Sequence, residues 1–246
     1  MDTGHRHIGM YWILAFGILG AAGVLAAAVL AANSGEEPKV HPDTAGWDPL
    51  FAADLSNADY PEGVWTFEDG VLTATKDQNI FTKKAYDDFV LDLEFKNAEG
   101  TNSGVVVYCS DKKNWIPNSV EVQIADDWSE KWSSQPASWQ CGAIFGHLPA
   151  SRTKVVKKPG EWNRMTVTCR GPIITVALNG EEVTRMDMRK WTSAEKNPDG
   201  TAIPKWLSRP KAELATKGHV GFQGKHAGAP IWFRNLRVKT LAAANP

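Results

Sequence analysis

Hydrophobic and polar positions divide this chain into two unlike parts. Residues 10–32 form one uncharged, largely apolar run, whereas the chain beyond it consists of short stretches that alternate between apolar and polar positions. A helix of that length rises about 34 Å at about 1.5 Å per residue, which matches a hydrocarbon core of about 30 Å. The pattern therefore predicts a short tail at 1–9 and a transmembrane helix over 10–32.

A cleaved signal peptide is the alternative interpretation of the same run. Its apolar core would be about 7–15 residues long and would end at small residues, as at Val29-Leu30-Ala31. The observed run is longer, and Arg6 is the only fixed cation before it, so we expect a retained anchor. Because Arg6 precedes the run and Glu36 and Glu37 follow it, we expect a cytoplasmic N-terminus and an external C-terminal domain.

Residues 46–241 have the pattern of β-strands joined by tight turns. Segment 89–95 alternates, so that four large apolar residues would share one face. Asp69-Gly70 and Asn179-Gly180 each separate two strand-like runs, as in two-residue hairpins. Further strands are expected at 64–67, 71–75, 104–108, 120–124, 165–169, 173–178, 181–184, 220–223 and 231–241. Many short strands without a long amphipathic helix predict an all-β antiparallel sandwich or barrel.

Two segments interrupt this pattern. Residues 33–45 are polar and contain two prolines, so they are expected to link the helix to the domain. Residues 186–217 contain three prolines and two tryptophans and are expected to form a long loop with one short helical turn. Loops of this length inside a compact domain usually bind a ligand or a partner. Residues 242–246 are expected to be a C-terminal tail.

Composition excludes some functions. The net charge is −1 and no basic block occurs, which argues against a nucleic-acid partner. The three cysteines, Cys109, Cys141 and Cys169, lack CxxC spacing, which argues against a zinc site. We expect them to be buried as small apolar side chains, with one disulfide in an oxidising compartment as the alternative.

A family likeness is carried by an ordered set of short blocks between residues 46 and 241. The blocks are WDPLF (47–51), FEDGVLT (67–73), FTKKAYDDF (81–89), LEFK (93–96), NSGV (102–105), EVQI (121–124), GAI (142–144), KPGEWN (158–163), LNG (178–180), GFQGKH (221–226) and FRNL (233–236). Together they resemble the 3-keto-disaccharide hydrolase family, long catalogued as a domain of unknown function.

This resemblance implies a concanavalin-like jelly roll, with two antiparallel sheets of which one is concave. It also implies an exported bacterial protein, and some members of the family cleave glycosides of 3-keto sugars. The chain departs from the family pattern at two places. Tyr108 stands where many relatives have arginine, and Gly224-Lys225 stands where many have an aspartate before His226.

Glycoside cleavage usually requires two carboxyl groups. Glu121 is the leading candidate, since it shares a strand face with Gln123, and Asp126 follows at the end of the same strand. Glu94 is a weaker alternative. A 3-keto sugar also permits elimination, which needs a base and a group that polarises the carbonyl. His226 and Lys225 are candidates for the second role, ahead of His147.

Aromatic residues in predicted loops form the remaining candidates. Trp115, Trp128, Trp132 and Trp139 lie within one stretch of 25 residues. We expect substrate to be bound by Trp115, Trp128 and Trp139 together with Asn102, Gln123 and Lys225. An interface with a protein or a cap over the core would also use tryptophan. No cofactor is expected, and calcium at Asp126 and Asp127 is the alternative.

These observations predict a membrane-anchored, extracytoplasmic, carbohydrate-active domain in the bacterial inner membrane, with its C-terminal domain in the periplasm or outside. Whether it is an enzyme stays open; an active form would be a glycoside hydrolase or a lyase acting on 3-keto sugars. A lectin-like module is one alternative. The other is an accessory subunit of a respiratory or photosynthetic complex, docked by the helix at 10–32 and by the tryptophan-rich loops, with the sandwich as an external cap.

Overall fold

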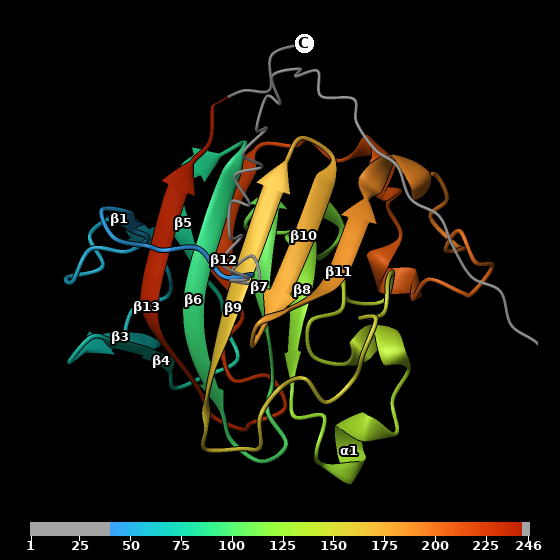
Figure 1. Cartoon of the computed structure of the whole chain (residues 1–246). Helices are drawn as coiled ribbons and strands as arrows, with labels where there is room; N and C mark the ends of the chain where they lie inside the picture. The colour runs from blue at the N-terminus through green and yellow to red at the C-terminus, as the bar shows by residue number, and fades with distance from the viewer. Residues whose placement is uncertain (1–39, 243–246) are drawn as a thin grey trace, which may run out of the picture. The chain divides into compact units, whose positions relative to one another are not determined.

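The computed structural model describes residues 40–242, which fold into two antiparallel β-sheets (Figure 1). The 8-stranded sheet has the order β11-β10-β9-β6-β13-β4-β3, with β1 beside β13, and the 5-stranded sheet has the order β2-β5-β12-β7-β8. The strands are β1 (Asp48–Pro49), β2 (Ala58–Asp59), β3 (Trp65–Glu68), β4 (Val71–Ala74), β5 (Ile80–Tyr86), β6 (Phe89–Asn97), β7 (Asn102–Cys109), β8 (Val120–Ala125), β9 (Trp162–Arg170), β10 (Ile173–Leu178), β11 (Glu181–Asp187), β12 (Gly218–Phe222) and β13 (Ile231–Thr240).

The all-β class and the jelly-roll-like sandwich are confirmed, and the predicted strands are present. The two predicted hairpins have the backbone that a two-residue primed turn requires, with φ of 51° and 75° at Asp69-Gly70 and of 49° and 92° at Asn179-Gly180. Strand β5 was not among the strands expected from alternation, because its sequence IFTKKAY places two lysines side by side.

One hydrophobic core fills the space between the sheets. The alternating residues Phe89, Leu91, Leu93 and Phe95 of β6 all point into it and are fully buried. The rings of Phe222 on the small sheet and Phe233 on the large sheet have centroids 4.6 Å apart. The inner face of the small sheet therefore packs against this core, and its other face lies outside the core.

Two connections are long: residues 126–161 between β8 and β9, and the part of segment 186–217 that joins β11 to β12. Segment 186–217 was expected to be a loop. Its regular structure consists of three 3₁₀ turns rather than the one expected, η3 (Met188–Lys190), η4 (Lys205–Leu207) and η5 (Lys211–Glu213). Elsewhere η1 (Ile116–Asn118), α1 (Glu130–Ser133) and η2 (Ala137–Trp139) flank β8. The three cysteines are free and buried, in agreement with the first of the two expectations.

The predicted N-terminal tail, the transmembrane helix at 10–32 and most of the linker lie outside the described residues. Within residues 40–242, no helix is both long enough and apolar enough to cross a membrane. The last residues of the predicted linker already contact the domain: His41 Nδ1 is 2.8 Å from Thr166 Oγ1, and Arg164 donates to the carbonyl of Pro42. The contacts of the sandwich therefore begin before residue 46.

Candidate functional site

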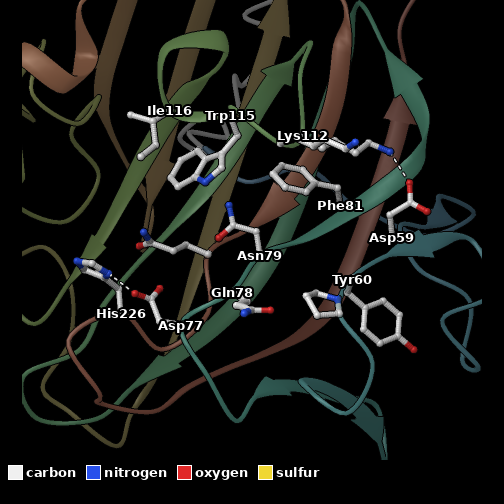
Figure 2. Close-up of a pocket in the computed structure, with 13 residues that line it drawn as sticks. Asp59, Tyr60, Asp77, Gln78, Asn79, Phe81, Lys112, Trp115, Ile116 and His226 are labelled. Atoms are coloured by element: carbon white, nitrogen blue, oxygen red, sulfur yellow. Dashed lines mark hydrogen bonds and ion pairs between the residues drawn. The ribbon is translucent and has the colours of Figure 1, made fainter.

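The outward face of the 5-stranded sheet carries two adjoining hollows, of about 640 Å³ and about 330 Å³. Trp115, Ile116, Gln223 and His226 line both hollows, so together they form one groove across the sheet. We call the larger one the Lys112 hollow, because it ends at the ion pair between Lys112 and Asp59 (Figure 2). The smaller one, the Glu121 hollow, contains the leading candidate carboxyl group.

Glu121 projects into this groove from near the start of β8, on the face that Gln123 shares. A side chain on the neighbouring β7 would fill its place: a Cβ at Gly104 would lie 2.2 Å from Glu121 Oε1. Burial raises the pKa of Glu121 to about 8, while the positive charge of Lys211 opposes this rise and the negative charge of Asp77 adds to it. The carboxyl group is therefore suited to exchange a proton near neutral or mildly alkaline pH.

Amide side chains line both hollows of the groove and have hydrogen-bonding groups without a partner in the described part of the chain. Gln123 Nε2 donates to Asn102 Oδ1 at 3.1 Å. Gln123 Oε1, Gln223 Oε1 and Asn79 Nδ2 are buried and have no hydrogen-bond partner among the described residues. These three atoms leave one donor and two acceptors that a ligand or water in the groove can pair with.

His226 lies where the two hollows meet and is paired with a carboxylate. Its Nδ1 is 2.7 Å from Asp77 Oδ2 (Figure 2), and its backbone bridges to Asn102. Since a carboxylate accepts, the pair keeps the proton on Nδ1 and leaves Nε2 for chemistry in the groove. The GFQGKH block has no aspartate before His226, and the carboxylate that pairs with His226 comes instead from Asp77.

The two residues before His226 differ in their positions. A Cβ at Gly224 would lie 2.3 Å from the carbonyl oxygen of Lys76, so the backbone packs too closely there for any side chain. Lys225 lines neither hollow of the groove. The structure therefore brings His226 into the site and leaves Lys225 outside it.

Aromatic walls enclose the Glu121 hollow, and they come from loops far apart in the sequence. The rings of Trp139 and Phe145 have centroids 5.1 Å apart, and Trp206 meets Trp139 edge to face at 6.2 Å. Trp115 and Trp132 complete the lining. Trp206 was not among the candidate residues; the only signal for it was the length of segment 186–217.

Trp128 is the predicted tryptophan that the structure places elsewhere. Its Nε1 donates to the carbonyl of Val156 at 2.8 Å, and the ammonium groups of Lys154 and Lys158 lie 5.1 and 5.6 Å from its ring centroid. It does not line either hollow of the groove.

Asp126 and Asp127 are fully buried and bind backbone groups rather than facing the groove. Asp126 accepts N–H groups from Gly100 and Trp128, at 2.9 and 3.2 Å. Asp127 accepts the N–H of Cys141 at 2.9 Å, and burial raises its pKa to about 6. Both carboxyl groups therefore fasten loops around β8. Across residues 40–242, no cluster of three or more His, Cys, Asp or Glu side chains could hold a metal ion.

The remaining candidates also lie outside the groove. Glu94 belongs to the large sheet, where its Oε2 accepts bonds from Arg234 and Asn235. His147 is buried, its Nδ1 is 2.7 Å from the carbonyl oxygen of Phe145, and burial lowers its pKa to about 4. Tyr108 has φ of 55° and turns into the core, where its hydroxyl donates to Gly171. The departure at Tyr108 therefore does not alter the groove.

A β-sandwich whose groove has amide side chains, aromatic walls and two titratable groups matches a carbohydrate-active class of protein. The chain belongs to the family described as 3-keto-alpha-glucoside-1,2-lyase-like domains, whose model matches residues 42–239. A 3-keto-disaccharide hydrolase from Bacteroides thetaiotaomicron is 26% identical, with 72% of this chain and 70% of that protein covered.

Solved structures agree with this assignment. A provisionally named glycosyl hydrolase from Parabacteroides distasonis ATCC 8503 is 59% identical and has a TM-score of 0.78, with 79% of this chain and 99% of that chain covered. A protein of unknown function from Bacillus subtilis has a galectin-like fold, 13% identity and a TM-score of 0.50, with 80% and 95% covered. The second likeness shows the fold alone.

Proposed function

We propose that this chain cleaves the glycosidic bond of 3-keto glycosides by elimination, with Glu121 as the base. The observation that carries the proposal is the half-buried carboxyl group of Glu121, at the bottom of a groove lined by unpartnered amides. The family description and the names of the relatives support the same class of substrate.

The reaction begins at C2 of the keto sugar, whose hydrogen is acidic because the neighbouring carbonyl stabilises the resulting enolate. The Glu121 carboxylate accepts this proton. The electron pair then forms the C1–C2 double bond and the C1–O bond breaks, with its electron pair going to the leaving oxygen. That oxygen takes the Nε2 proton of His226 in its imidazolium form, whose Nδ1 proton stays on the hydrogen bond to Asp77. The products are an unsaturated keto sugar and an alcohol; addition of one water across the double bond yields the hydrolysis product.

The two hollows suit a substrate with two rings. We assign the keto sugar to the Glu121 hollow and the leaving group to the Lys112 hollow, which places the scissile bond beside His226, a residue of both. The unpartnered amides of Gln123 and Gln223 would bind sugar hydroxyls, and the tryptophan faces would cover the apolar faces of the rings.

Replacing Glu121 by glutamine tests this proposal. Glu121→Gln keeps the shape but removes the base, so kcat/KM on a 3-keto disaccharide is expected to fall by about 10³-fold. In the unaltered enzyme kcat/KM is expected to rise with pH toward the Glu121 pKa of about 8, because only the carboxylate accepts a proton. Glu94→Gln, a strand glutamate outside the groove, is the matched control.

The lectin-like alternative gives a different result in the same experiment. If the unaltered chain bound the 3-keto disaccharide without turnover, and Glu121→Gln bound it equally well, the groove would be a binding site only. Turnover that Glu121→Gln leaves unchanged would instead move the base to another residue.

We also propose that residues 10–32 anchor the chain in a bacterial inner membrane, with the sandwich on the periplasmic or external side. The apolar run and the charges that flank it support this arrangement. The full chain is expected to sediment with membranes and to resist alkaline extraction, whereas a chain starting at residue 40 is expected to be released. A full chain found in the soluble fraction would contradict the anchor. Migration with a large complex in mild detergent would favour the accessory-subunit alternative.

A further inference from the structure

Lys211 is a buried cation that the proposed reaction does not yet use. It is only 2% exposed, although lysine is almost never fully buried unless it has a partner. Its Nζ donates to the carbonyl of Ser119 at 2.9 Å. Ser119 directly precedes β8, so the ammonium group is held at the base of the strand that carries Glu121.

Residues on both sides of Lys211 in segment 186–217 contact the rest of the domain. The N–H of Ala212 donates to the carbonyl of Trp191 at 3.1 Å, and Leu214 packs into the core. The guanidinium group of Arg209 donates to Asn118 Oδ1. The lysine is therefore held by contacts on both sides along the chain and is not free to turn outward.

The charges of Lys211 and Glu121 act on each other. Burial raises the pKa of Glu121, and Lys211 is the cation that opposes this rise. Burial lowers the pKa of Lys211 to about 8, and Glu121 is the anion that opposes this fall. Four other groups face the pair: Asp77 and His226 from the groove side, and Arg209 and His147 from the side of Lys211.

We propose that Lys211 is a positioning residue for the elimination: its buried charge, held beside the start of β8, favours the ionised form of Glu121 that accepts the C2 proton. Segment 186–217 thereby supplies both a wall of the groove, through Trp206, and the counter-charge of the base. The expected effect on kcat/KM rests on the proposed function. The expected coupling between the charges of Lys211 and Glu121 rests on the contacts of Lys211.

Lys211→Met tests the proposal by removing the charge while keeping the length and apolar stem of the side chain. An opposite charge nearby shifts a carboxyl pKa by about one unit or more, so the rise of kcat/KM with pH should move about one unit higher. At pH 7 kcat/KM should fall about tenfold, and at pH 10 it should lie within about twofold of the unaltered enzyme. Lys205→Met, on an exposed part of the same segment, is the control.

A uniform loss of activity at every pH would overturn the proposal, because a lysine that only supports the fold would behave in that way. Lys211→Gln is the second variant, since it lacks the charge but retains a donor for the carbonyl of Ser119. It should show the same displacement of the pH profile as Lys211→Met.

A measurement without substrate separates this inference from the proposed function. Carbon-13 NMR titration should give a lower pKa for Lys211 in Glu121→Gln than in the unaltered chain, because the coupling of the two charges is reciprocal. An equal Lys211 pKa in both proteins would overturn the inference even if the enzyme is active. If the Lys211 pKa is lower in Glu121→Gln but the unaltered chain does not turn over 3-keto glycosides, the coupling of the two charges is supported and the proposed reaction is contradicted.

Discussion

Glu121 fits into the groove only because residue 104 on the neighbouring strand has no side chain. The Cβ of any other residue at 104 would lie 2.2 Å from Glu121 Oε1 and 2.8 Å from its Cγ, which is closer than atoms in contact approach. The glutamate is flexible enough to move, whereas the strand is held by β8 and β12. The collision would therefore displace the carboxyl group rather than the backbone.

Gly104→Ala is accordingly expected to lower kcat/KM by at least about 10²-fold, since a small misplacement of a catalytic group costs about that much. The free energy of unfolding should change by less than about 1 kcal/mol, because the methyl group meets a movable side chain. Kinetics and chemical denaturation measure the two effects. Thr175→Ala, on β10 of the other sheet, is the control; full activity in Gly104→Ala would show that Glu121 does not need its observed position.

The position of a candidate side chain was predictable from the sequence where the residue lies within an alternating strand, because alternation determines the face on which the side chain lies. Two-residue spacing on one strand put Glu121 and Gln123 on the same face, and the structure brings both into the groove. Alternation ends with the strand, so it gave no information on Asp126, whose carboxyl group binds backbone N–H groups of neighbouring loops. The pairing of His226 with Asp77 joins segments 149 residues apart, and no local pattern reports such a contact.

At the scale of elements, segment 186–217 is a part of the site and not merely a connection. It contributes Trp206 and Leu207 to the wall of the Glu121 hollow and Lys211 to the base of β8. Its length and its prolines indicated a functional loop, but not which of its side chains would reach the groove, because its 3₁₀ turns have no periodic hydrophobic pattern.

Two tryptophans that are exposed among residues 40–242 allow a matched comparison at this scale. Trp206 is 54% exposed and lines the groove, whereas Trp128 is 41% exposed and lies outside it. Trp206→Ala is expected to raise KM about fivefold and to change kcat little, because an aromatic face contributes about 1 kcal/mol to binding. Trp128→Ala should leave both constants unchanged. An equal effect of the two substitutions would mean that Trp206 does not contact the substrate.

For the whole molecule, local signals in the sequence were sufficient to predict the fold class. Alternation in β6 identified its buried face, and Asp69-Gly70 and Asn179-Gly180 identified two hairpins. The order of strands was not predictable from these signals, because β13 lies between β6 and β4 and pairs residues more than 130 positions apart. Only the resemblance to a known family implied the two-sheet arrangement and its ligand-binding face.

The three cysteines of the chain all lie in the interior, at most 2% exposed, and none is bridged. Burial raises the pKa of each thiol well above its usual range, so thiol reagents can modify them only when the sandwich opens. The rate at which thiol reagents modify the cysteines therefore measures how often the sandwich opens. A ligand that binds the groove should slow this modification, because it stabilises the closed fold.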